Sequence, residues 1–374
     1  MKVAVVHEWL VTYAGSEKVC EQLLLMFPEA ELYSLVEFLD DELRFFLHER
    51  SPRTSFLQHL PFAKRHFRAY LPLMPLAIEQ FDLSDYDLVL SSHHAVTKGV
   101  ITRPDQLHIS YVHTPMRYAW EMQQQYLQGA NLKRGIRAIA ASAILHYLRM
   151  WDVATANRVD HYLANSRFVA QRIWKTYRRK ATVVYPPVAI DRFQARSVRD
   201  DFYLTISRFV PYKRVDLTVQ AFTRLGLPLV VIGDGPTREQ VTSQGSSNVV
   251  FLAPQSDAVI EDYLQRCKAF VYPAEEDFGI TLVEAQAAGA PVIAYGKGGA
   301  AETVISGKTG ILFNEQTVDS MVSAIQQFED GQFTFQLEDL RQQAERFSPD
   351  RFRQELSQLI DQKFAQFRAG DAIH

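Results

Sequence analysis

Residues 269–286 read Ala269-Phe-Val-Tyr-Pro-Ala-Glu-Glu276-Asp-Phe-Gly-Ile-Thr-Leu-Val-Glu284-Ala-Gln. The apolar run at the start predicts a strand that ends at Pro273, and the pattern that follows predicts a helix beginning near Gly279. Glu276 therefore lies in the loop at the carboxyl edge of a sheet, whereas Glu284 lies more than one turn inside the helix. Between the two carboxylates the helix N-terminus presents free backbone N–H groups, which favour an anion such as phosphate.

Short apolar runs alternate with helical patterns along the whole chain, which is typical of parallel sheets with crossover helices. At 374 residues the chain exceeds the usual size of one domain. The predicted fold class is α/β, with two Rossmann-like, doubly wound domains that face each other across a ligand cleft. The predicted strands are Lys2–Val6, Asp87–Leu90, His108–Val112 and His161–Ala164 in the first half, and Phe202–Ile206, Leu229–Ile232, Val249–Leu252, Ala269–Tyr272 and Val292–Ala294 in the second.

The boundary between the domains is expected near Tyr185-Pro-Pro-Val188, because two consecutive prolines resist continuing either a helix or a central strand. The tail from Asp350 onward has apolar residues at helical spacing, which predicts an amphipathic helix docked on a core. The predicted domains are therefore 1–185, completed by a C-terminal helix over 350–370, and 186–349.

Composition excludes several classes of protein. A net charge of -3 argues against a general nucleic-acid binder, which is normally basic. Two cysteines, Cys20 and Cys267, are too few and too distant for a disulfide framework or a zinc site, which favours a reducing cytoplasm. No apolar run reaches the roughly 18–20 residues of a membrane-spanning helix, so any membrane contact is expected to be peripheral.

A second group of candidate residues follows the predicted strand at 202–206. The sequence Ser207-Arg208-Phe-Val-Pro-Tyr-Lys213 places two cations just after this strand end. A guanidinium binds phosphate oxygens bidentately and a lysine adds a mobile point charge, so the pair suits a diphosphate. The turn Gly233-Asp-Gly-Pro236 follows the next strand, and its glycines allow close backbone approach, which favours a nucleotide beside that strand end.

Taken together and in this order, these segments over residues 200–313 resemble the donor half of glycosyltransferase family 4. The resemblance implies a retaining, metal-independent GT-B enzyme without a cofactor. It implies that Arg208 and Lys213 bind the donor diphosphate, that Glu276 binds the transferred sugar, and that Glu284 binds the ribose. The further donor contacts predicted on this basis are Gly233, Asp277, Phe278, Gly279, Ile280, Thr281 and Leu282.

The first half resembles the family less tightly. In Tyr13-Ala-Gly15-Ser16, Ala14 replaces the first of two glycines that the family usually has in a loop near the donor diphosphate. If Ala14 keeps a negative φ the loop geometry survives, so Gly15 and Ser16 are predicted donor contacts.

The segment Ile109–Trp120 is similar to that of bacterial mannosyltransferases that use GDP-mannose and build surface polysaccharides. The similarity implies that His113 contacts the transferred sugar. Arg117, Asn165 and Ser166 are candidate sugar or acceptor contacts, although Asn165 and Ser166 have an equally sufficient role as caps of the helix that begins at Arg167.

Two segments of the first half, 59–75 and 131–151, combine cations with large apolar side chains. Both are interpreted as amphipathic helices, and the open alternative is an anionic interface that brings a peripheral enzyme to a lipid-linked acceptor at the inner face of the membrane. His93-His94 is not expected to bind a metal, because adjacent strand residues point to opposite faces and no cysteine or carboxylate lies at ligand spacing.

The predicted function is transfer of a hexose, with GDP-mannose as the leading donor and UDP-sugars as the runner-up, to a glycan or lipid-linked glycan. GT-B architecture also serves sugar-nucleotide epimerases and hydrolases, so this second enzyme class stays open. A non-catalytic partner of another transferase is a third class, and the joint presence of Arg208, Lys213, Glu276 and Glu284 speaks against it.

Overall fold

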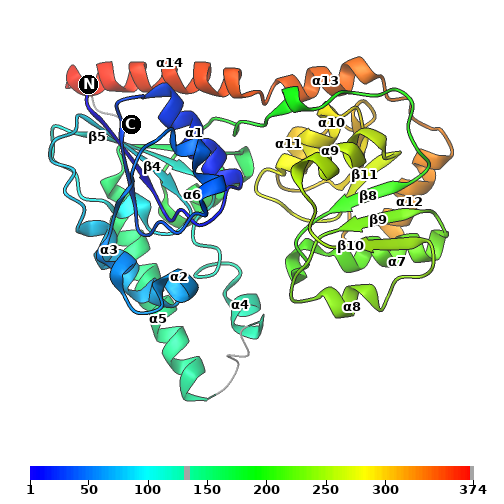
Figure 1. Cartoon of the computed structure of the whole chain (residues 1–374), viewed down its shortest axis with the longest axis horizontal. Coiled ribbons are helices and arrows are strands. Elements are labelled where there is room, and N and C mark those ends of the chain that lie inside the picture. Colours follow the sequence, from blue (N-terminus) through cyan, green and yellow to red (C-terminus); the bar gives the residue numbers. More distant parts are fainter. Residues whose placement is uncertain (130–134, 371–374) are drawn as a thin grey trace. The chain divides into compact units, whose positions relative to one another are not determined.

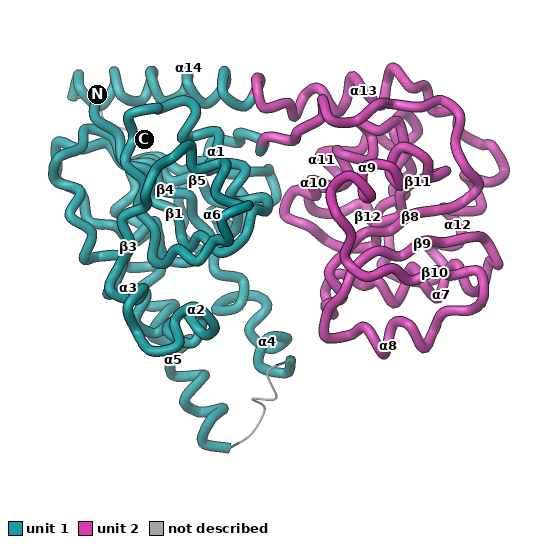
Figure 2. The backbone as a smooth tube through the Cα atoms, viewed as in Figure 1, with its two compact units in different colours: residues 1–186, 352–374 teal, residues 187–351 magenta. Residues whose placement is uncertain are grey.

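The computed structural model describes residues 1–129 and 135–370. The chain divides into two compact units (Figure 2). Unit 1 contains Met1–Pro186 together with the segment from Phe352 onward, and unit 2 contains Pro187–Arg351. The chain therefore passes from one unit to the other twice.

Unit 1 is built on a parallel sheet of seven strands in the order β3-β2-β1-β4-β5-β6-β7 (Figure 1). The strand order reverses between β1 and β4, so the carboxyl ends of these two strands form a topological switch point, where open sheets of this kind bind ligands. The strands are β1 (Val3–His7), β2 (Glu31–Ser34), β3 (Arg53–Thr54), β4 (Leu88–His93), β5 (Leu107–Val112), β6 (His161–Ala164) and β7 (Ala181–Val183).

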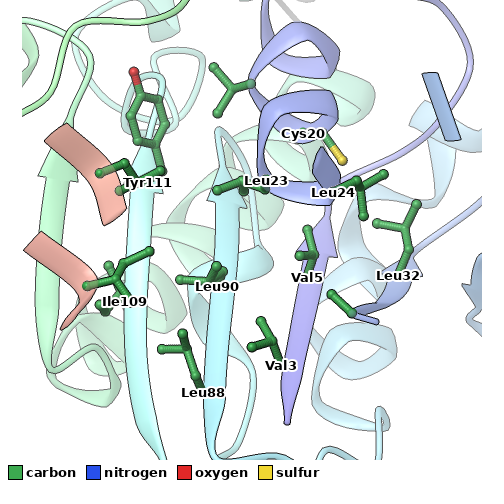
Figure 3. Close-up of a cluster of buried hydrophobic side chains, with 14 of the residues drawn as sticks. Val3, Val5, Cys20, Leu23, Leu24, Leu32, Leu88, Leu90, Ile109 and Tyr111 are labelled. Carbon is green, nitrogen blue, oxygen red and sulfur yellow. The ribbon is translucent and has the colours of Figure 1, made fainter. Parts of the chain in front are cut away.

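Helices cover both faces of this sheet. The α-helices are α1 (Gly15–Met26), α2 (Ala63–His66), α3 (Met74–Glu79), α4 (Gln123–Gly129), α5 (Ile136–Ala154), α6 (Arg167–Tyr177) and α14 (Pro349–Arg368). Short 3-10 helices are η1 (Asp41–Leu47), η2 (Phe56–His59), η3 (Phe67–Leu73), η4 (Thr97–Gly99) and η5 (Thr155–Arg158). In one core cluster, Val5, Leu90 and Ile109 of the sheet pack with Leu23 of α1, as Figure 3 shows. The C-terminal helix α14 adds Phe352, Leu356 and Ile360 to the same cluster.

Unit 2 has a parallel sheet of six strands in the order β10-β9-β8-β11-β12-β13. Its switch point lies between β8 and β11. The strands are β8 (Tyr203–Ile206), β9 (Leu229–Ile232), β10 (Val249–Leu252), β11 (Ala269–Tyr272), β12 (Val292–Tyr295) and β13 (Gly310–Phe313). The helices are η6 (Ile190–Arg192), η7 (Pro211–Lys213), α7 (Val215–Leu225), α8 (Arg238–Thr242), α9 (Asp257–Arg266), α10 (Ile280–Ala287), α11 (Ala300–Thr303), α12 (Val318–Glu329) and α13 (Leu337–Glu345).

The sequence prediction of the fold class is confirmed, since both units are α/β with parallel sheets. All nine predicted strands are present. Among the described residues the prediction missed four strands: β2, β3, β7 and β13. Three of these, β3, β7 and β13, lie at sheet edges, where a strand is short and carries little of the apolar pattern that identifies a central strand.

The prediction of one amphipathic helix over 59–75 is wrong. The chain forms η2, α2, η3 and α3 in succession, and Phe62 adopts a left-handed conformation with φ of 57°. Pro61 and Pro72 lie within this segment, and proline lacks the N–H that a continuous helix requires. In the second segment, α5 begins at Ile136, while residues 131–134 lie outside the described part of the chain.

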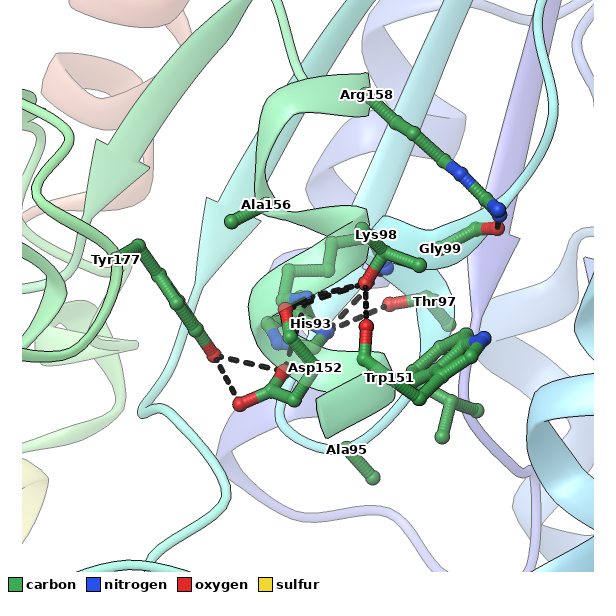
Figure 4. Close-up of polar contacts among 12 residues, drawn as sticks. His93, Ala95, Thr97, Lys98, Gly99, Trp151, Asp152, Ala156, Arg158 and Tyr177 are labelled. Carbon is green, nitrogen blue, oxygen red and sulfur yellow. Dashed lines mark hydrogen bonds and ion pairs between the residues drawn. The ribbon is translucent and has the colours of Figure 1, made fainter. Parts of the chain in front are cut away.

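A fully buried ion pair connects α5 to η4, the 3-10 helix that follows β4 (Figure 4). The Nζ atom of Lys98 lies 2.9 Å from Oδ1 of Asp152, and it also donates to the Thr155 hydroxyl at 2.7 Å. The hydroxyl of Tyr177 and the indole N–H of Trp120 donate to the same carboxylate. Burial lowers the pKa of Lys98, and the charge of Asp152 opposes that effect.

Candidate active site

The carboxyl edge of the unit 2 sheet gathers a lysine, a tyrosine and a glutamate at the β8/β11 switch point. Nζ of Lys213 donates to the hydroxyl of Tyr272 at 3.0 Å, and that hydroxyl donates to Oε1 of Glu276 at 2.9 Å. Lys213 also forms an ion pair with Glu276, and both side chains are largely buried. Burial raises the pKa of Tyr272, so its hydroxyl stays protonated as the bridge between the two charged groups.

Backbone packing explains how Glu276 is held outside any helix or named strand. The Gly299 N–H donates to the Glu276 carbonyl oxygen at 2.8 Å, and Glu276 forms an isolated parallel bridge with Gly298. A Cβ atom at Gly298 would collide with the Glu276 carbonyl oxygen, and Gly298 has a φ of 66°. Glycine is therefore required for the loop after β12 to approach the loop after β11 this closely.

Helix α10 begins directly after Gly279, whose φ of 84° turns the chain from the Glu276 loop into the helix. The predicted contacts in this stretch differ in what they can offer a ligand. The side chains of Phe278 and Leu282 are buried in the protein, and Phe278 packs against Phe347 with ring centroids 5.3 Å apart. Their predicted contact with a donor can therefore involve only backbone atoms, whereas Asp277, Ile280 and Thr281 are partly exposed.

Glu284 lies inside α10 and is paired with a residue that the sequence analysis missed. Nη2 of Arg192 donates to Oε1 of Glu284 at 2.9 Å, and Arg192 lies 3.4 Å from Asp257 at the start of α9. The Glu284 side chain is 8% exposed, so Arg192 supplies the charge that a nearly buried carboxylate needs. A separation of 92 residues along the chain hides this pair from sequence inspection.

The glycine turn after β9 supports the segment that carries Arg208. The Phe209 N–H donates to the Asp234 carbonyl oxygen at 2.8 Å. A Cβ at Gly233 would collide with the Ser207 carbonyl oxygen. The glycines thus allow two loops at the sheet edge to touch, while the Arg208 side chain between Ser207 and Phe209 remains exposed.

In unit 1, the loop between β1 and α1 contains the predicted donor contacts Gly15 and Ser16. Ala14 is the N-cap of α1 and has a φ of -135°, so alanine fits this position without strain. Glu17 closes the loop, because its Oε2 accepts hydrogen bonds from the Ala14 N–H and the Ser16 hydroxyl, both at 3.0 Å. Ser16 is therefore engaged with Glu17 within the loop.

His113 follows β5 and belongs to a chain of buried polar groups. Its Nε2 lies 2.9 Å from the Ser92 hydroxyl at the end of β4, and the same hydroxyl lies 3.1 Å from Nδ1 of His7 at the end of β1. Nε2 of His7 in turn lies 3.3 Å from Oε1 of Glu17. Burial holds the pKa of His113 well below its usual range, so its imidazole is neutral.

The other unit 1 candidates lie around His113. The Asn165 amide donates to the His113 carbonyl oxygen at 2.9 Å, and Ser166 caps α6 by accepting from the Val169 N–H at 3.0 Å. Ser166 therefore has the capping role that the sequence left open, whereas Asn165 ties the start of α6 to the segment after β5 instead. Arg117 donates to the Met122 sulfur at 3.1 Å and lies 4.0 Å from Glu121.

Glu8 organises the turn after β4. Its buried carboxylate accepts hydrogen bonds from the backbone N–H groups of residues 94–97. Burial alone would raise the pKa of Glu8, but a hydrogen bond with His93 and the charge of His94 hold it below its usual range. The adjacent histidines therefore serve this turn: His93 contacts Glu8, and the His94 ring packs against Trp9 with centroids 4.6 Å apart.

Sequence reasoning missed Tyr272, Arg192, Glu17, His7 and Ser92. Two of these carried a usable signal. Tyr272 is the last residue of a predicted strand, and Glu17 stands three residues after the N-cap, the position from which a side chain caps a helix. The others depend on tertiary pairing between segments far apart in the chain.

Comparison with known proteins agrees with this architecture. Residues 32–192 match the family model described as Glycosyltransferase Family 4, and residues 189–347 match the one described as Glycosyl transferases group 1. Two parallel-sheet units that match these models define a glycosyltransferase of the GT-B fold. Within that class, the chain belongs to the glycosyltransferases in which a Family 4 domain is followed by a group 1 domain.

Curated relatives are similar over part of their length. O-antigen chain mannosyltransferase C of Escherichia coli is 35% identical over 104 residues, which cover 26% of this chain and 28% of that protein. The GDP-mannose-dependent alpha-(1-6)-phosphatidylinositol monomannoside mannosyltransferase of Mycolicibacterium smegmatis is 29% identical over 233 residues, covering 52% of this chain and 61% of that protein. The chain thus spans between about a quarter and three fifths of the length of these relatives.

Among solved structures, the Anabaena protein HepE in complex with UDP and glucose superposes with a TM-score of 0.68 at 16% identity, covering 96% of this chain and 99% of that one. At this identity the likeness establishes the fold.

Proposed function

We propose that the protein is a retaining transferase that moves mannose from GDP-mannose to an acceptor hydroxyl in polysaccharide or glycolipid synthesis. The observation that carries this proposal is the Lys213–Tyr272–Glu276 cluster at the β8/β11 switch point. It combines a cation for phosphate with a carboxylate for sugar hydroxyls beside the start of α10. Mannose is supported by the names of the two similar mannosyltransferases, and GDP by the name of the one from Mycolicibacterium smegmatis.

The reaction breaks the bond between the anomeric carbon and the β-phosphate oxygen and forms a bond from that carbon to the acceptor oxygen. Negative charge grows on the departing phosphate, so stabilising it is the main catalytic task. Lys213, Arg208 and the first N–H groups of α10 would share that charge without a metal ion. The acceptor proton passes to the departing phosphate oxygen on the same face of the sugar, which gives retention.

The remaining roles follow the same division. Glu276 would bind hydroxyls of the transferred sugar, and His113 would contact that sugar from unit 1. Glu284, positioned by Arg192, would accept hydrogen bonds from the ribose hydroxyls. Gly15 and Ser16 would approach the diphosphate.

Binding of nucleotides tests the donor directly. We expect GDP and GDP-mannose, without divalent metal, to raise the melting temperature, whereas UDP and UDP-glucose leave it unchanged. A ligand at a hundredfold excess over its Kd stabilises a protein by about 2.7 kcal/mol. The measurement is a dye-based thermal shift confirmed by calorimetric titration. Selective binding of uridine nucleotides, the kind of ligand in the HepE complex, would replace the donor, and no binding by any nucleotide would contradict the proposal.

A second measurement separates transfer from the epimerase and hydrolase alternative. Incubation with GDP-mannose alone is expected to leave the donor intact. Rapid conversion or hydrolysis of the donor without an acceptor would favour the alternative class.

We further propose that the enzyme acts while bound to the anionic cytoplasmic face of a membrane. Within the described residues no helix has the combined length and apolar character to cross a bilayer. Helix α5, however, carries an exposed apolar stripe and projects away from the sheet (Figure 1). The members of this stripe are spaced three or four residues apart and therefore share one face of the helix. They are Ile136, Ile139, Ala143, Tyr147 and Met150.

The exposure of this stripe argues for a lipid partner. The Ile136 and Ile139 side chains are 85% and 71% exposed, although the opposite side of the helix already buries Leu145 and Leu148 in the core. Exposed Arg137 and the exposed cations Lys64, Arg65 and Arg68 near α2 match anionic headgroups. Apolar side chains flanked by cations are what an interfacial helix requires.

We expect the protein to sediment with vesicles that contain anionic lipid at low salt, and not with purely zwitterionic vesicles. The double substitution Ile136→Asp and Ile139→Asp should reduce the bound fraction at least fivefold, because each change replaces buried apolar contact with a charge repelled by the surface. Val198→Asp, at a residue of unit 2 that is 84% exposed, is the matched control and should bind normally. Equal vesicle binding by the two variants would contradict a membrane-binding role of the stripe. Formation of dimers that depend on the stripe, without vesicle binding, would contradict it as well.

A further inference from the structure

The polar chain beneath His113 runs through four segments of unit 1. It links Glu17 of α1 to His7 at the end of β1, His7 to Ser92 at the end of β4, and Ser92 to His113 after β5. Glu17, His7 and Ser92 are all buried, with exposed fractions of 2%, 0% and 0%. Polar groups buried to this extent are hydrogen-bonded within the protein, so the direction of each hydrogen bond in this network can be worked out.

Glu17 determines which group donates and which accepts in every hydrogen bond of this network. Burial raises its pKa, but the hydrogen bond with His7 and a backbone hydrogen bond oppose burial and lower the pKa to about 2. The ionised carboxylate can only accept hydrogen bonds. Its Oε2 accepts from the Ala14 N–H and the Ser16 hydroxyl, and its Oε1 is left to accept from Nε2–H of His7.

The remaining directions follow when each imidazole carries a single proton, so that one nitrogen donates and the other accepts. With Nε2 of His7 donating to Glu17, Nδ1 of His7 accepts, so the Ser92 hydroxyl donates to it. The oxygen of Ser92 then accepts from Nε2–H of His113. This leaves Nδ1 of His113 as an acceptor, and Nδ1 makes no hydrogen bond to any residue in the described part of the chain.

We propose that Glu17, acting through His7 and Ser92, fixes His113 as the tautomer protonated at Nε2, so that Nδ1 accepts a hydrogen bond from a hydroxyl of the transferred sugar. Glu17, His7 and Ser92 are thus positioning residues, and they do not touch the sugar. The identity of the group that Nδ1 contacts rests on the proposed function, whereas the tautomer itself depends only on this network.

The substitution Glu17→Gln gives a sharp test because it should reverse the direction of each hydrogen bond between residue 17 and His113. The Ala14 N–H and the Ser16 hydroxyl both need an acceptor, so the amide oxygen of the new side chain takes the place of Oε2 and its NH₂ group faces His7. His7 then accepts at Nε2 and donates from Nδ1 to Ser92, and Ser92 donates to Nε2 of His113. The expected result is a His113 protonated at Nδ1, although two side chains separate it from the substituted position.

The tautomer can be read in the full-length protein labelled with ¹⁵N-histidine, by long-range ¹H–¹⁵N correlation at about pH 8, where histidines of ordinary pKa are neutral. His113→Gln assigns the signal. Glu21→Gln is the matched control, since Glu21 lies one turn further along α1 and contacts Tyr13 outside the network. We expect Nε2–H in the wild type and in Glu21→Gln, and Nδ1–H in Glu17→Gln. A wild-type His113 protonated at Nδ1, or an unchanged tautomer in a folded Glu17→Gln variant, would overturn the proposal.

Ser92→Ala provides the test if Glu17→Gln does not fold. It removes the acceptor of Nε2–H, so the His113 signals should show a mixture of tautomers, and retention of pure Nε2–H would contradict the role of Ser92. In kinetic assays, Glu17→Gln should lower kcat/KM for the sugar nucleotide about tenfold, the effect of one hydrogen bond of about 1.4 kcal/mol, with the affinity for GDP unchanged. If the wild type binds no sugar nucleotide, the proposed function fails while the tautomer result stands on its own.

Discussion

Replacing Lys213 with alanine is expected to lower turnover between about tenfold and a hundredfold, because a hydrogen bond to a charged group contributes about 1.5–3 kcal/mol and here it acts on the departing phosphate. The same change leaves Glu276 and the Tyr272 hydroxyl without their cation. The loss should therefore appear in kcat as well as in donor affinity. Steady-state kinetics with the preferred nucleotide sugar measure both.

Lys308→Ala is a suitable control for that experiment. Lys308 belongs to the same unit and also pairs with a carboxylate, Asp339 at 3.0 Å, but it is 48% exposed. We expect full activity from this variant. A folded Lys213→Ala enzyme with wild-type turnover would remove Lys213 from the mechanism and with it the assignment of this sheet edge to the diphosphate.

Replacing Asp152 with alanine is expected to lower the free energy of unfolding of unit 1 by about 3–5 kcal/mol, since it leaves the fully buried Lys98 ammonium without its counter-charge. Trp120 and Tyr177 also lose the acceptor that satisfies them. The four tryptophans of the chain, Trp9, Trp120, Trp151 and Trp174, all belong to unit 1. Urea unfolding followed by tryptophan fluorescence therefore reports on this unit.

A second variant separates the unpaired charge from simple loss of packing. Adding Lys98→Met to Asp152→Ala removes the orphaned ammonium, so the double variant should recover much of the lost stability. Asp105→Ala, which breaks an exposed pair with Arg103 in the same unit, should cost about 1 kcal/mol or less. Equal instability of the single and double variants would show that Lys98 and Asp152 are not energetically coupled.

The parts of the fold that the sequence predicted are those in which a residue's neighbours along the chain decide its structure. Central strands such as Ala269–Tyr272 are continuous apolar runs, and the tail shows helical spacing whose members Phe352, Leu356 and Ile360 are indeed buried in α14. The same logic places Glu276 at a strand end and Glu284 inside a helix. It fails over 59–75, where prolines break a pattern that otherwise reads as one helix.

The parts of the candidate site and of the unit 1 core that the sequence did not predict are pairings between distant residues. His7 and Ser92 are 85 residues apart, and Lys98 and Asp152 are 54 apart. Parallel pairing of β1 with β4 places His7 opposite Ser92, but composition and periodicity carry no signal of that register. Nothing in the sequence distinguishes Arg192 from the other arginines, because its pairing with Glu284 arises only when η6 packs against α10. Strand-end position thus predicts which groups gather at a sheet edge, and only the folded chain shows which of them bind one another.

The passage of the chain back into unit 1 has a consequence for synthesis. The three α14 side chains that complete the unit 1 core are translated after all of unit 2, and each contributes about 1.5–3 kcal/mol of burial. Until α14 has emerged from the ribosome, unit 1 keeps an open apolar face, although all residues of unit 2 have already been synthesised. The usual order, in which the N-terminal domain matures first, is therefore reversed for this protein, and its first half depends longest on protection from aggregation.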